Sequence, residues 1–487
     1  MYQVPHYIDN NKVFIIQRSE IEGRLEPEFY RPSIADLEKI IRGKSSHKLR
    51  DYALSVSGGA TPKKTEGDKY YADKETGVPF LRVQNLNTDG TLSFDDCLYI
   101  NKETHEGMLA RSQVSEGDLL VKITGVGRMA IASVAPEGFI GNTNQHMVVV
   151  KTGNKEKSKY LARYLNLDII EKIASRHSTG GTRPALDYPS VKNLPIIEGI
   201  DFSPIDRAIE LKKQKRSEAK KLLDSIAPYL LNELGIILPN ENYGLEKRIF
   251  YISSSECVDK RIDPKKYSPK TKDLYLAIEN SLYPKYSLVS FIVDSCSGDW
   301  GSDGEVDIVP SGWTKCVVLR GTEIDNMYNL SICQEKVKKR LIQTDKFKKI
   351  QPLLNDIIIE KSGGSDDQPV GRVAIVDLEN FNNIPLSFSN FLMKIRVKGI
   401  DANYLYYYLK TIYNIGGTDS MQSQTNGIRN LIIKEYLEQK VVVPSLEKQQ
   451  EISNHIVEMR LMAKRLQEEG ESILENAKKE VEQMILG

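Results

Sequence analysis

The sequence predicts a mixed α+β protein built from two duplicated, strand-rich globular domains, each followed by a long helix. Three observations carry this prediction. The string RLEPEFYRP at 24–32 has a near copy, RIDPKKYSP, at 261–269, displaced by 237 positions in a chain of 487 residues. Apolar strand patterns and polar loops then follow both strings in the same order. After each series, apolar residues recur every three or four positions, which is the period of a helix.

The composition supports more than one domain and a reducing environment. The chain has 40% hydrophobic and 27% charged residues and a formal net charge of +1, so any nucleic-acid surface must be a local basic patch. Five cysteines form no CxxC pair, which indicates reduced thiols. The first residues, MYQVPHYIDNNK, do not resemble a signal peptide, and no apolar run reaches the length of a membrane span. We therefore expect a cytoplasmic protein.

The repeat extends well beyond the opening strings. GDLLVKITGVGRMAIAS (117–133) and NDIIIEKSGGSDDQPVGRVAIVD (355–377) both read as strand, polar glycine-containing loop and strand, and this alignment pairs Arg128 with Arg372. NTNQHMVVV (142–150) aligns with SFSNFLMKI (387–395), which pairs Gln145 with Asn390. The later elements recur as pairs: helices at 160–165 and 404–409, polar loops at 175–186 and 416–430, and closing strands at 194–197 and 441–444.

The two helical segments carry heptad-like seams. Their seam positions are Ile205, Ile209, Lys212, Arg216, Ala219, Leu223, Ile226 and Leu230, and then Ile452, Ile456, Met459, Ala463, Leu466, Gly470, Ile473, Ala477 and Met484. This spacing favours an antiparallel coiled coil between the two helices, and the alternative is that each helix packs on its own domain. The predicted boundaries are 1–199 and 239–445 for the domains and 200–238 and 446–487 for the helices. The basic run LKKQKRSEAKK (211–221) faces either DNA phosphates or solvent.

A catalytic or metal signature is not apparent. GVG (125–127) is too short for a dinucleotide site, and GGATPKKT (58–65) lacks the second glycine of a P-loop. The six histidines are scattered without an HExxH motif. Asp303, Glu305 and Asp307 read as a solvated acidic turn rather than a metal site. We therefore predict no catalytic residue, no metal and no cofactor on this chain.

The polar loops supply the side chains that read DNA. Arginine pairs with guanine, asparagine or glutamine with adenine, and hydroxyls with either. The candidates in the first domain are Lys63, Arg82, Thr124, Arg128, Asn144, Gln145, Arg176, Thr179, Thr182 and Arg183. Those in the second domain are Trp300, Lys361, Ser362, Gln368, Arg372, Asn390, Gln422, Ser423, Asn426 and Arg429. Ordinary solvated loops are the alternative, and Arg128 and Arg372 could be structural instead.

Together these motifs resemble the specificity (S) subunits of type I restriction–modification enzymes. The resemblance covers nearly the whole chain. It rests on SGGATPKK (57–64), VPFLRVQNLNTDGTLSFDDCLYI (78–100), GDLLVKITGVGRMAIA (117–132), NTNQH (142–146) and STGGTRPALDYPSVKNLPI (178–196). The second half departs at CSGDWGSDGE (296–305) and shows no clear counterpart of RVQNL. In the two opening strings, we expect Pro27 and Pro264 to end a strand, and Tyr30 and Tyr267 to pack the following helix.

The resemblance implies a non-catalytic subunit that reads double-stranded DNA. Each target recognition domain would read one half of a bipartite site, while the helices set the spacing and dock two methyltransferase subunits. Restriction/translocase subunits would join this core, and S-adenosylmethionine, ATP and Mg would bind on the partners. Two alternatives differ in class: a self-sufficient DNA modification or cleavage enzyme, and a scaffold of a phage-defence assembly that reads no sequence.

Overall fold

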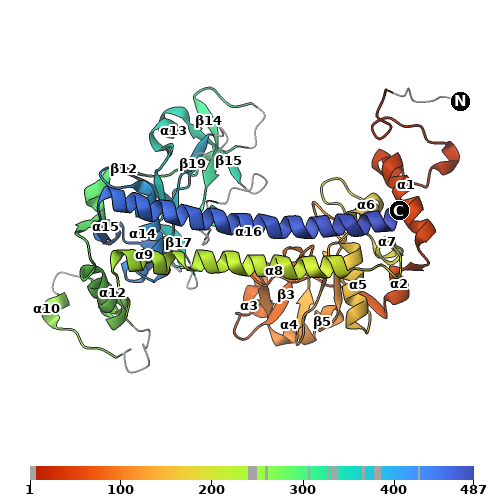
Figure 1. Ribbon diagram of the computed structural model, residues 1–487, viewed down its shortest axis with the longest axis horizontal. Coiled ribbons are helices and arrows are strands. Elements are labelled where there is room, and N and C mark those ends of the chain that lie inside the picture. Colours follow the sequence, from red (N-terminus) through yellow and green to blue (C-terminus); the bar gives the residue numbers. More distant parts are fainter. Residues whose placement is uncertain are drawn as a thin grey trace. The chain divides into compact units, whose positions relative to one another are not determined.

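The computed structural model describes residues 7–239, 249–257, 261–304, 308–325, 328, 330, 337–364, 368–377, 385–425 and 428–487. The chain forms two compact units. Unit 1 comprises Met1–Arg216 with Leu466–Gly487, and unit 2 comprises Ser217–Arg465. Each unit therefore contains a strand-rich body and a segment of both long helical regions (Figure 1). Among the described residues, no helix has the length and apolar character that a membrane span requires.

Unit 1 has two four-stranded sheets. The first is antiparallel, in the order β2 (Ser55–Gly58), β9 (Met147–Lys151), β6 (Leu119–Lys122), β7 (Ala132–Val134). The second has the order β4 (Leu98–Ile100), β3 (Val78–Leu81), β8 (Ile140–Thr143), β5 (Gln113–Ser115), and only its β3–β8 pair is parallel. A short pair joins β1 (His47–Lys48) to β10 (Pro195–Ile196).

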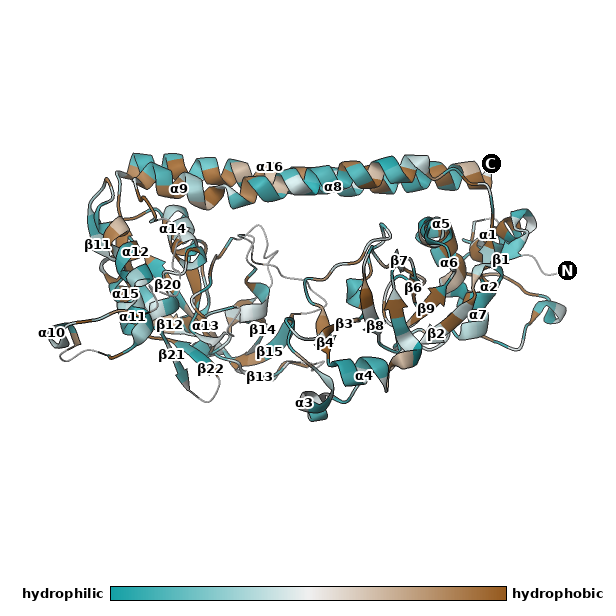
Figure 2. Ribbon diagram, turned by 90° about the horizontal axis from the view of Figure 1, so that it is seen from below, coloured by the Kyte–Doolittle hydropathy of each residue, from teal (hydrophilic) through white to brown (hydrophobic). Residues whose placement is uncertain are grey.

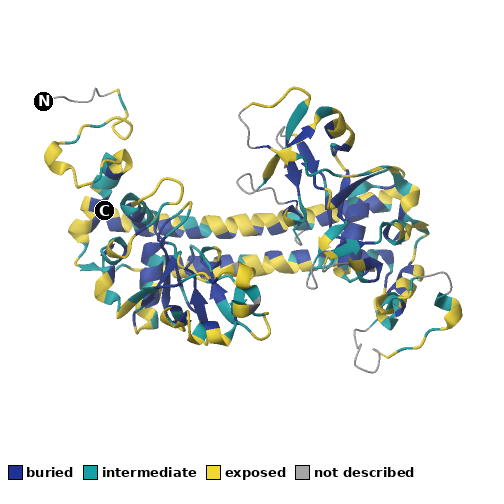
Figure 3. Ribbon diagram, turned by 180° about the vertical axis from the view of Figure 1, so that it is seen from behind, coloured by how far each residue is buried: buried dark blue, intermediate teal, exposed yellow. Residues whose placement is uncertain are grey.

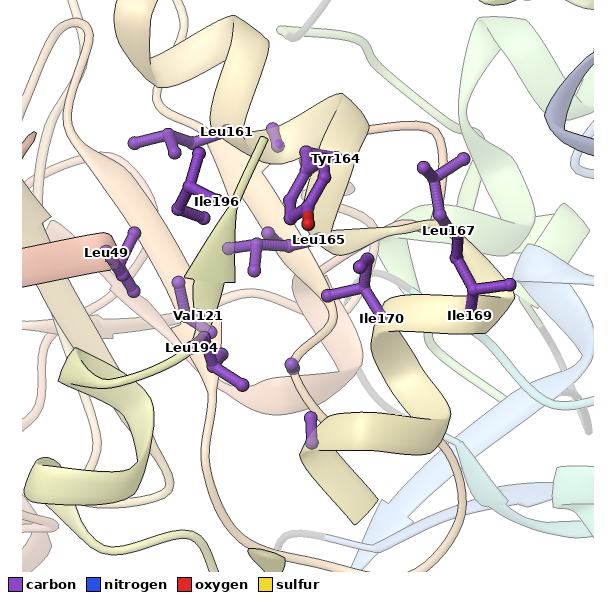
Figure 4. Close-up of a cluster of buried hydrophobic side chains, with 14 of the residues drawn as sticks. Leu49, Val121, Leu161, Tyr164, Leu165, Leu167, Ile169, Ile170, Leu194 and Ile196 are labelled. Atoms are coloured by element: carbon purple, nitrogen blue, oxygen red, sulfur yellow. The ribbon is translucent and has the colours of Figure 1, made fainter. Parts of the chain in front are cut away.

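The helices of unit 1 are α1 (Pro32–Lys44), α2 (Leu49–Tyr52), α3 (Gly67–Tyr70), α4 (Lys102–Glu106), α5 (Lys155–Leu165), α6 (Asp168–His177) and α7 (Tyr188–Lys192). Helix α5 packs on the first sheet, and α4 lies beside the second, where His105 forms a hydrogen bond with Asn142 of β8. Asn154 begins α5, because its side chain accepts hydrogen bonds from the backbone N–H groups of Glu156 and Lys157. Figure 4 shows how Val121 of β6, Leu161 and Leu165 of α5 and Ile196 of β10 meet in this core.

Unit 2 repeats this plan with an added sheet. Its first sheet is β12 (Ile292–Ser297), β20 (Leu392–Val397), β16 (Ile357–Glu360), β18 (Val373–Ile375), and its second is β13 (Ser302–Asp303), β15 (Lys338–Gln343), β14 (Trp313–Leu319), β19 (Leu386–Phe388). The added sheet is β17 (Ser362–Gly364), β22 (Ile428–Leu431), β21 (Gln422–Thr425). The pair β11 (Lys285–Ser287) and β23 (Lys440–Val442) corresponds to β1 and β10.

The helices of unit 2 are α10 (Ser254–Cys257), α11 (Pro264–Tyr267), α12 (Pro269–Glu279), α13 (Thr344–Ile350), α14 (Ala402–Asn414) and α15 (Ile433–Glu438). The tyrosine-rich α14 is enclosed on all sides, and every residue from Tyr404 to Tyr413 is buried. Buried tyrosine hydroxyls need partners. Tyr404 and Tyr408 donate theirs to the carbonyls of Val442 and Lys440, which fixes α14 against β23.

Backbone hydrogen bonds confirm the duplication and correct one predicted pairing. Ile123 N donates to His146 O, and Lys361 N donates to Phe391 O, so Gln145 and Asn390 are equivalent as predicted. Lys122 N donates to Ile131 O, and Glu360 N donates to Arg372 O, both at 2.8 Å. Arg372 is therefore equivalent to Ile131, and its predicted pairing with Arg128 is wrong by three residues.

Unit 2 also has the counterpart of RVQNL that its sequence did not reveal. Asn144 N donates to Leu81 O, and Ser389 N donates to Leu319 O, so Arg82 corresponds to Arg320. A short 3₁₀ turn follows each arginine, with Arg82 N donating to Asn85 Oδ1 at 2.7 Å and Arg320 N to Glu323 Oε2 at 2.6 Å. The segment RGTEI (320–324) thus replaces RVQNL, with a carboxylate in place of the amide.

The long helices pair antiparallel within each unit. They are α8 (Ser203–Asp224), α9 (Ile226–Leu234) and α16 (Leu446–Leu486). In unit 1, Lys212 pairs with Glu471 at 2.7 Å and Lys215 with Glu469 at 2.6 Å, so rising numbers on α8 meet falling numbers on α16. In unit 2, Lys448 pairs with Glu233 at 2.7 Å. The predicted fold class, two duplicated domains with antiparallel helices, is confirmed, and Figure 2 shows apolar residues recurring along these helices.

The seam differs from the prediction in three places. Figure 3 colours the long helices by burial, and buried and exposed stretches alternate along them. The helix predicted over 200–238 breaks at Ser225, between α8 and α9. Arg216 is exposed, whereas the other predicted seam residues of this segment are buried. On α16 the frame holds through Gly470, where an added Cβ would lie 3.3 Å from the Cα of Lys212. Beyond it Leu474, Val481 and Ile485 are buried, while Met484 is 58% exposed.

The prolines of the two opening strings begin short helical turns rather than end strands. Pro27 is the first residue of a 3₁₀ turn, Pro27–Tyr30, and Pro264 is the first residue of α11. Proline suits this position because its missing N–H has no partner in a helix. The described residues just before each proline form no strand.

Candidate DNA-binding surface

Polar loops gather at one edge of each unit. Parallel strands end at the same edge of a sheet, so the segments after β3 and β8 emerge together in unit 1, as do those after β14 and β19 in unit 2. The segments after β6 and β16 join them. We call these groups the loop edges. Among the described residues, the loop edge of unit 1 is 59–63, 82–84, 123–128, 144–146 and 178–185, and that of unit 2 is 298–301, 320–322, 361–364, 368, 389–391, 420–425 and 428–430.

Hydrogen bonds link the loops of each edge. In unit 1, Thr61 donates to the amide oxygen of Gln145, and Ala185 forms β-bridges with both Thr124 and Thr179. Gly59 and its equivalent Gly298 let the loop after β2 or β12 approach its neighbour, because a Cβ would lie 1.7 Å from Thr143 O or 2.0 Å from Phe388 O. Any larger residue there would separate the loops.

Unit 2 arranges the same loops as a sheet. Strand β22 lies between β17 and β21 and pairs with both. In unit 1 the equivalent of β22 is Ala185, which bridges Thr124 on one side and Thr179 on the other. The Ser362 hydroxyl donates to Asn430 Oδ1 at 2.7 Å, and Lys361 Nζ donates to Ser297 Oγ at 2.8 Å. Figure 2 draws the β21–β22 hairpin in hydrophilic colours. A polar hairpin on a rigid scaffold is suited to a DNA groove.

Most predicted residues of unit 1 lie at its loop edge with their side chains available. Lys63, Gln145, Thr179, Thr182 and Arg183 are exposed. Thr124 and Arg82 are half-buried, and Arg82 Nη2 donates to Asp96 O.

Three predicted residues of unit 1 are committed to contacts inside the protein. Arg128 forms an ion pair with Asp168 and donates to Asn166 O at 2.6 Å. Arg176 forms an ion pair with Glu38 and donates to Phe29 O at 2.6 Å. Asn144 is buried, with its Oδ1 accepting from His146 N at 3.1 Å. These contacts engage the guanidinium groups of Arg128 and Arg176 and the amide oxygen of Asn144 within the protein, which argues against the predicted DNA contacts at these three positions.

Unit 2 gives a similar division. Asn390 and Ser423 are exposed, and Trp300, Lys361, Ser362, Gln368 and Arg429 are half-buried. Trp300 lies beneath the guanidinium of Arg340, 4.7 Å from its ring centroid. Asn426 lies outside the described residues.

Arg372 and Gln422 are corrected in unit 2. Arg372 is buried and donates two hydrogen bonds to the carboxylate of Glu360, at 2.7 and 2.8 Å. Gln422 is buried, and its amide nitrogen donates to the carbonyls of Thr418 and Val370. Both side chains stabilise the scaffold beneath the loop edge instead of facing DNA.

Sequence reasoning missed several residues of the loop edges. His146 and Phe391 occupy equivalent positions, and Phe391 is 49% exposed, which suits contact with a thymine methyl group. Gln424 is exposed on β21, opposite Arg429. Lys338 and Lys339 are exposed where β15 begins, next to the end of β14. The missed signal was a basic run, residues 336–349, with seven Lys or Arg and one acid.

Two titratable groups near the loop edge of unit 1 are shifted. Burial and then the nearby positive charge of Arg183 lower the pKa of His146, so its ring is neutral at pH 7. Burial raises the pKa of Glu38, but hydrogen bonds and charge from His177 and Arg176 outweigh it and lower the pKa to about 2. Glu38 therefore remains a carboxylate that holds Arg176 in place.

The described residues contain no group of three or more His, Cys, Asp or Glu that could hold a metal ion. Asp303 is described, whereas Glu305 and Asp307 lie outside the described residues. Cys97, Cys257, Cys296 and Cys316 are free thiols, and Cys333 lies outside the described part. What the loop edges offer is amides, hydroxyls and cations, which recognise base edges and phosphates.

Comparison with known proteins bears on unit 2 directly. The family model described as "Type I restriction modification DNA specificity domain" matches residues 318–458. The match spans most of the loop edge of unit 2, and it confirms over these residues the family resemblance that the sequence motifs indicated. A search of curated protein sequences gave no match.

Solved structures that resemble the chain belong to the same kind of system. The Type-I restriction-modification system S subunit from M. genitalium has 12% sequence identity, with 90% of this chain and 95% of that chain covered, and a TM-score of 0.34. The HsdS subunit from Thermoanaerobacter tengcongensis has the same identity and coverage and a TM-score of 0.31. A chain from a structure on assembly and conformational transition of the type I R-M system has 16% identity, the same coverage and a TM-score of 0.38. Likenesses with TM-scores this low do not assign a function.

Proposed function

We propose, from the premise that residues 318–458 are a type I restriction–modification DNA specificity domain, that the whole chain is the DNA-specificity subunit of such a system. The observation that carries the proposal is the second copy of this domain in unit 1. The two units share hydrogen bonds at equivalent positions in β6 and β16, at the starts of β9 and β20, and after β3 and β14. Each unit then reads one half of a bipartite site in double-stranded DNA.

The loop edges supply different side chains for the two half-sites. Unit 1 presents Gln145, Thr182 and Arg183, and unit 2 presents Asn390, Ser423 and Gln424. Arginine can bond guanine through two donors, and a side-chain amide can bond adenine through a donor and an acceptor. Because the two loop edges present different sets of side chains, we expect the two halves of the site to differ in sequence.

The long helices serve as the spacer between half-sites and as the docking surface for two methyltransferase subunits. At a rise of about 1.5 Å per residue, the 41 residues of α16 extend over roughly 60 Å, which approaches two turns of B-DNA at about 34 Å each. Inserting residues near Ser217 should change the spacer length or abolish binding, with the half-site sequences unaltered. An active insertion variant with an unchanged spacer would contradict this role.

Catalysis belongs to the partners in this proposal. Methyltransferase subunits bind S-adenosylmethionine, and restriction/translocase subunits bind ATP and Mg. The chain itself contributes recognition, since its loop edges carry polar groups that suit bases and phosphates.

Sequencing the methylated bases of the host genome, with and without this gene, tests the proposal. We expect one bipartite motif, two short specified halves around an unspecified spacer, to lose methylation when the gene is deleted. An unchanged methylome, together with no base preference of the chain in a selection from randomised duplexes, would support a scaffold instead. Methylation of DNA by the purified chain alone would support a self-sufficient enzyme.

A further inference from the structure

In each unit, the first arginine of the opening string, RLEPEFYRP or RIDPKKYSP, reaches a loop of the loop edge. Arg24, from RLEPEFYRP, donates from Nη2 to the backbone carbonyl of Ser178 at 2.9 Å. Arg261, from RIDPKKYSP, donates from Nη1 to the backbone carbonyl of Gln422 at 2.7 Å and from Nη2 to that of Ser420. These partners lie more than 150 residues away in the sequence.

The two units make the same bond at equivalent positions. Leu186 N donates to Ile123 O and Leu431 N to Lys361 O, which makes Ala185 equivalent to Asn430. Ala185 bridges Thr179, and Asn430 pairs with Ser423, so Thr179 is equivalent to Ser423. The accepting carbonyls of Ser178 and Gln422 therefore occupy the same place, directly before the first residue of each loop.

Each arginine pairs with the acid two residues further on, Arg24 with Glu26 at 3.2 Å and Arg261 with the equivalent Asp263 at 2.9 Å, but the other contacts that hold the two side chains differ. In unit 1 the Arg24 guanidinium lies 4.5 Å from the ring centroid of Phe29. In unit 2 the position of Phe29 is taken by Lys266, which pairs with Glu435 at 2.8 Å, and Glu435 also contacts Arg261 at 3.3 Å. These further contacts have diverged, whereas the ion pair with the nearby acid and the bond from guanidinium to loop carbonyl are present in both units.

The arginines are placed to position the loop rather than to bind phosphate. Their side chains are only 21% and 27% exposed, and Nη2 of Arg24 and both Nη atoms of Arg261 already donate to groups of the protein. A hydrogen bond from a charged donor is roughly twice as strong as a neutral one. Held at this carbonyl, the backbone fixes where the following side chains stand, from Thr179 to Arg183 in unit 1 and at Ser423 and Gln424 in unit 2.

We infer that Arg24 and Arg261 are positioning residues for sequence specificity, each fixing the DNA-reading loop of its own unit and thereby determining the selectivity of one half-site only. This inference rests on the proposed function and adds to it the groups that set the loop conformation. A residue that touches no base would then control which bases are chosen.

The test is a selection of full-length chain on randomised duplexes, with the wild type compared with Arg24→Ala and Arg261→Ala. We expect each variant to lose about five- to tenfold of its discrimination between bases at one half-site, a part of what direct base contacts provide. The other half-site, read by the same molecules, is the internal standard for folding. Arg24→Ala should lose discrimination at the half-site that unit 1 reads, and Arg261→Ala at the half-site that unit 2 reads.

Conservative and matched controls separate positioning from general damage. Arg24→Lys and Arg261→Lys keep a charged donor that can reach one carbonyl, and should recover part of the selectivity. Arg31→Ala and Lys265→Ala remove a neighbouring charge in each unit, from the half-buried Arg31 and the exposed Lys265, and should leave both half-sites unchanged. Equal weakening at both half-sites, or intact selectivity in both alanine variants, would overturn the inference. If the wild-type chain selects no bipartite motif, it is the proposed function that fails.

Discussion

The two units share their backbone hydrogen bonds and differ in the chemistry placed on them. At the loop edge, unit 1 joins its loops by single bridges at Thr124, Ala185 and Thr179, whereas unit 2 joins the equivalent segments in the sheet of β17, β22 and β21. Where unit 1 has Leu98 and Tyr99 beside the end of β3, unit 2 has Lys338 and Lys339 beside the end of β14. The scaffold therefore constrains the main chain and leaves side chains and loop length open to change.

The second sheets extend in opposite directions from a common centre. The order β4-β3-β8 in unit 1 matches β15-β14-β19 in unit 2, including the parallel pair. Unit 1 adds β5 beside β8, and unit 2 adds β13 beside β15. An added strand is thus tolerated at either margin, because the shared parallel pair alone brings the loops together.

The largest difference to test is the buried ion pair of unit 2. Arg372 and Glu360 occupy positions held by Ile131 and Lys122 in unit 1. Arg372→Met should destabilise unit 2 by about 3–5 kcal/mol, because it leaves the Glu360 carboxylate buried without its partner. Amide hydrogen exchange should accelerate in β16 and β18 and stay unchanged in β6 and β7.

A double variant provides the control for this prediction. Glu360→Leu with Arg372→Met removes both charges, and it should recover most of the lost protection because apolar replacement of a buried pair is often neutral. Ile131→Val, at the equivalent position of unit 1, should cost no more than about 1.5 kcal/mol. A double variant no more stable than the single one would mean that the ion pair is not the cause.

The charge difference at the loop edges predicts a smaller effect, on affinity. Replacing Lys338 and Lys339 by alanine should weaken binding of all sequences to a similar extent and lower the slope of log affinity against log salt by up to about 2. Titrations at several salt concentrations measure this slope. Lys348 and Lys349 lie on α13, beyond the other end of β15, so their alanine variants should change the slope little. A shift in preferred bases would indicate that the β15 lysines read sequence.

The smallest expected effect is a pH dependence of the stability of unit 1. It arises from His146, whose equivalent in unit 2, Phe391, does not titrate. Because the folded state holds the pKa of His146 below its usual value, the unfolded chain binds the proton more readily. The contribution of neutral His146 to the stability of unit 1 is complete above the unfolded pKa of about 6.5 and declines as pH falls through that value toward the lowered folded pKa. Hydrogen exchange at pH 7 and pH 5.5 should show a slight extra loss of protection around β9, which His146→Gln abolishes. An equal loss in that variant would assign the effect to other groups.

The sequence was sufficient for the order of elements and for one equivalence at the site. Strand alternation and motif order are local properties, and Gln145 and Asn390 each lie a fixed distance before a strand. The pairing of Arg128 with Arg372 failed for a physical reason. Residues 362–371 occupy the place of the shorter stretch 124–130, so the similar strings GRMAI and GRVAI enter their strands in different registers.

The role of each arginine at the site was beyond local sequence reasoning. Whether Arg176 is free or bound depends on Glu38, 138 residues away, and composition does not reveal that contact. Lys338 and Lys339 were overlooked because they belong to a basic run. A basic run is most often a solvated face, and only the pairing of Lys338 with Val318 places this run at the loop edge.

The anchoring of the exposed loops through main-chain carbonyls has a consequence for how such a protein acquires new targets. Arg24 and Arg261 hold groups that every amino acid possesses, so mutations at 179–185 or 423–430 leave the anchor intact. A library randomised at these positions can therefore vary the side chains that face DNA, while each arginine keeps its hydrogen bond to the backbone of the loop.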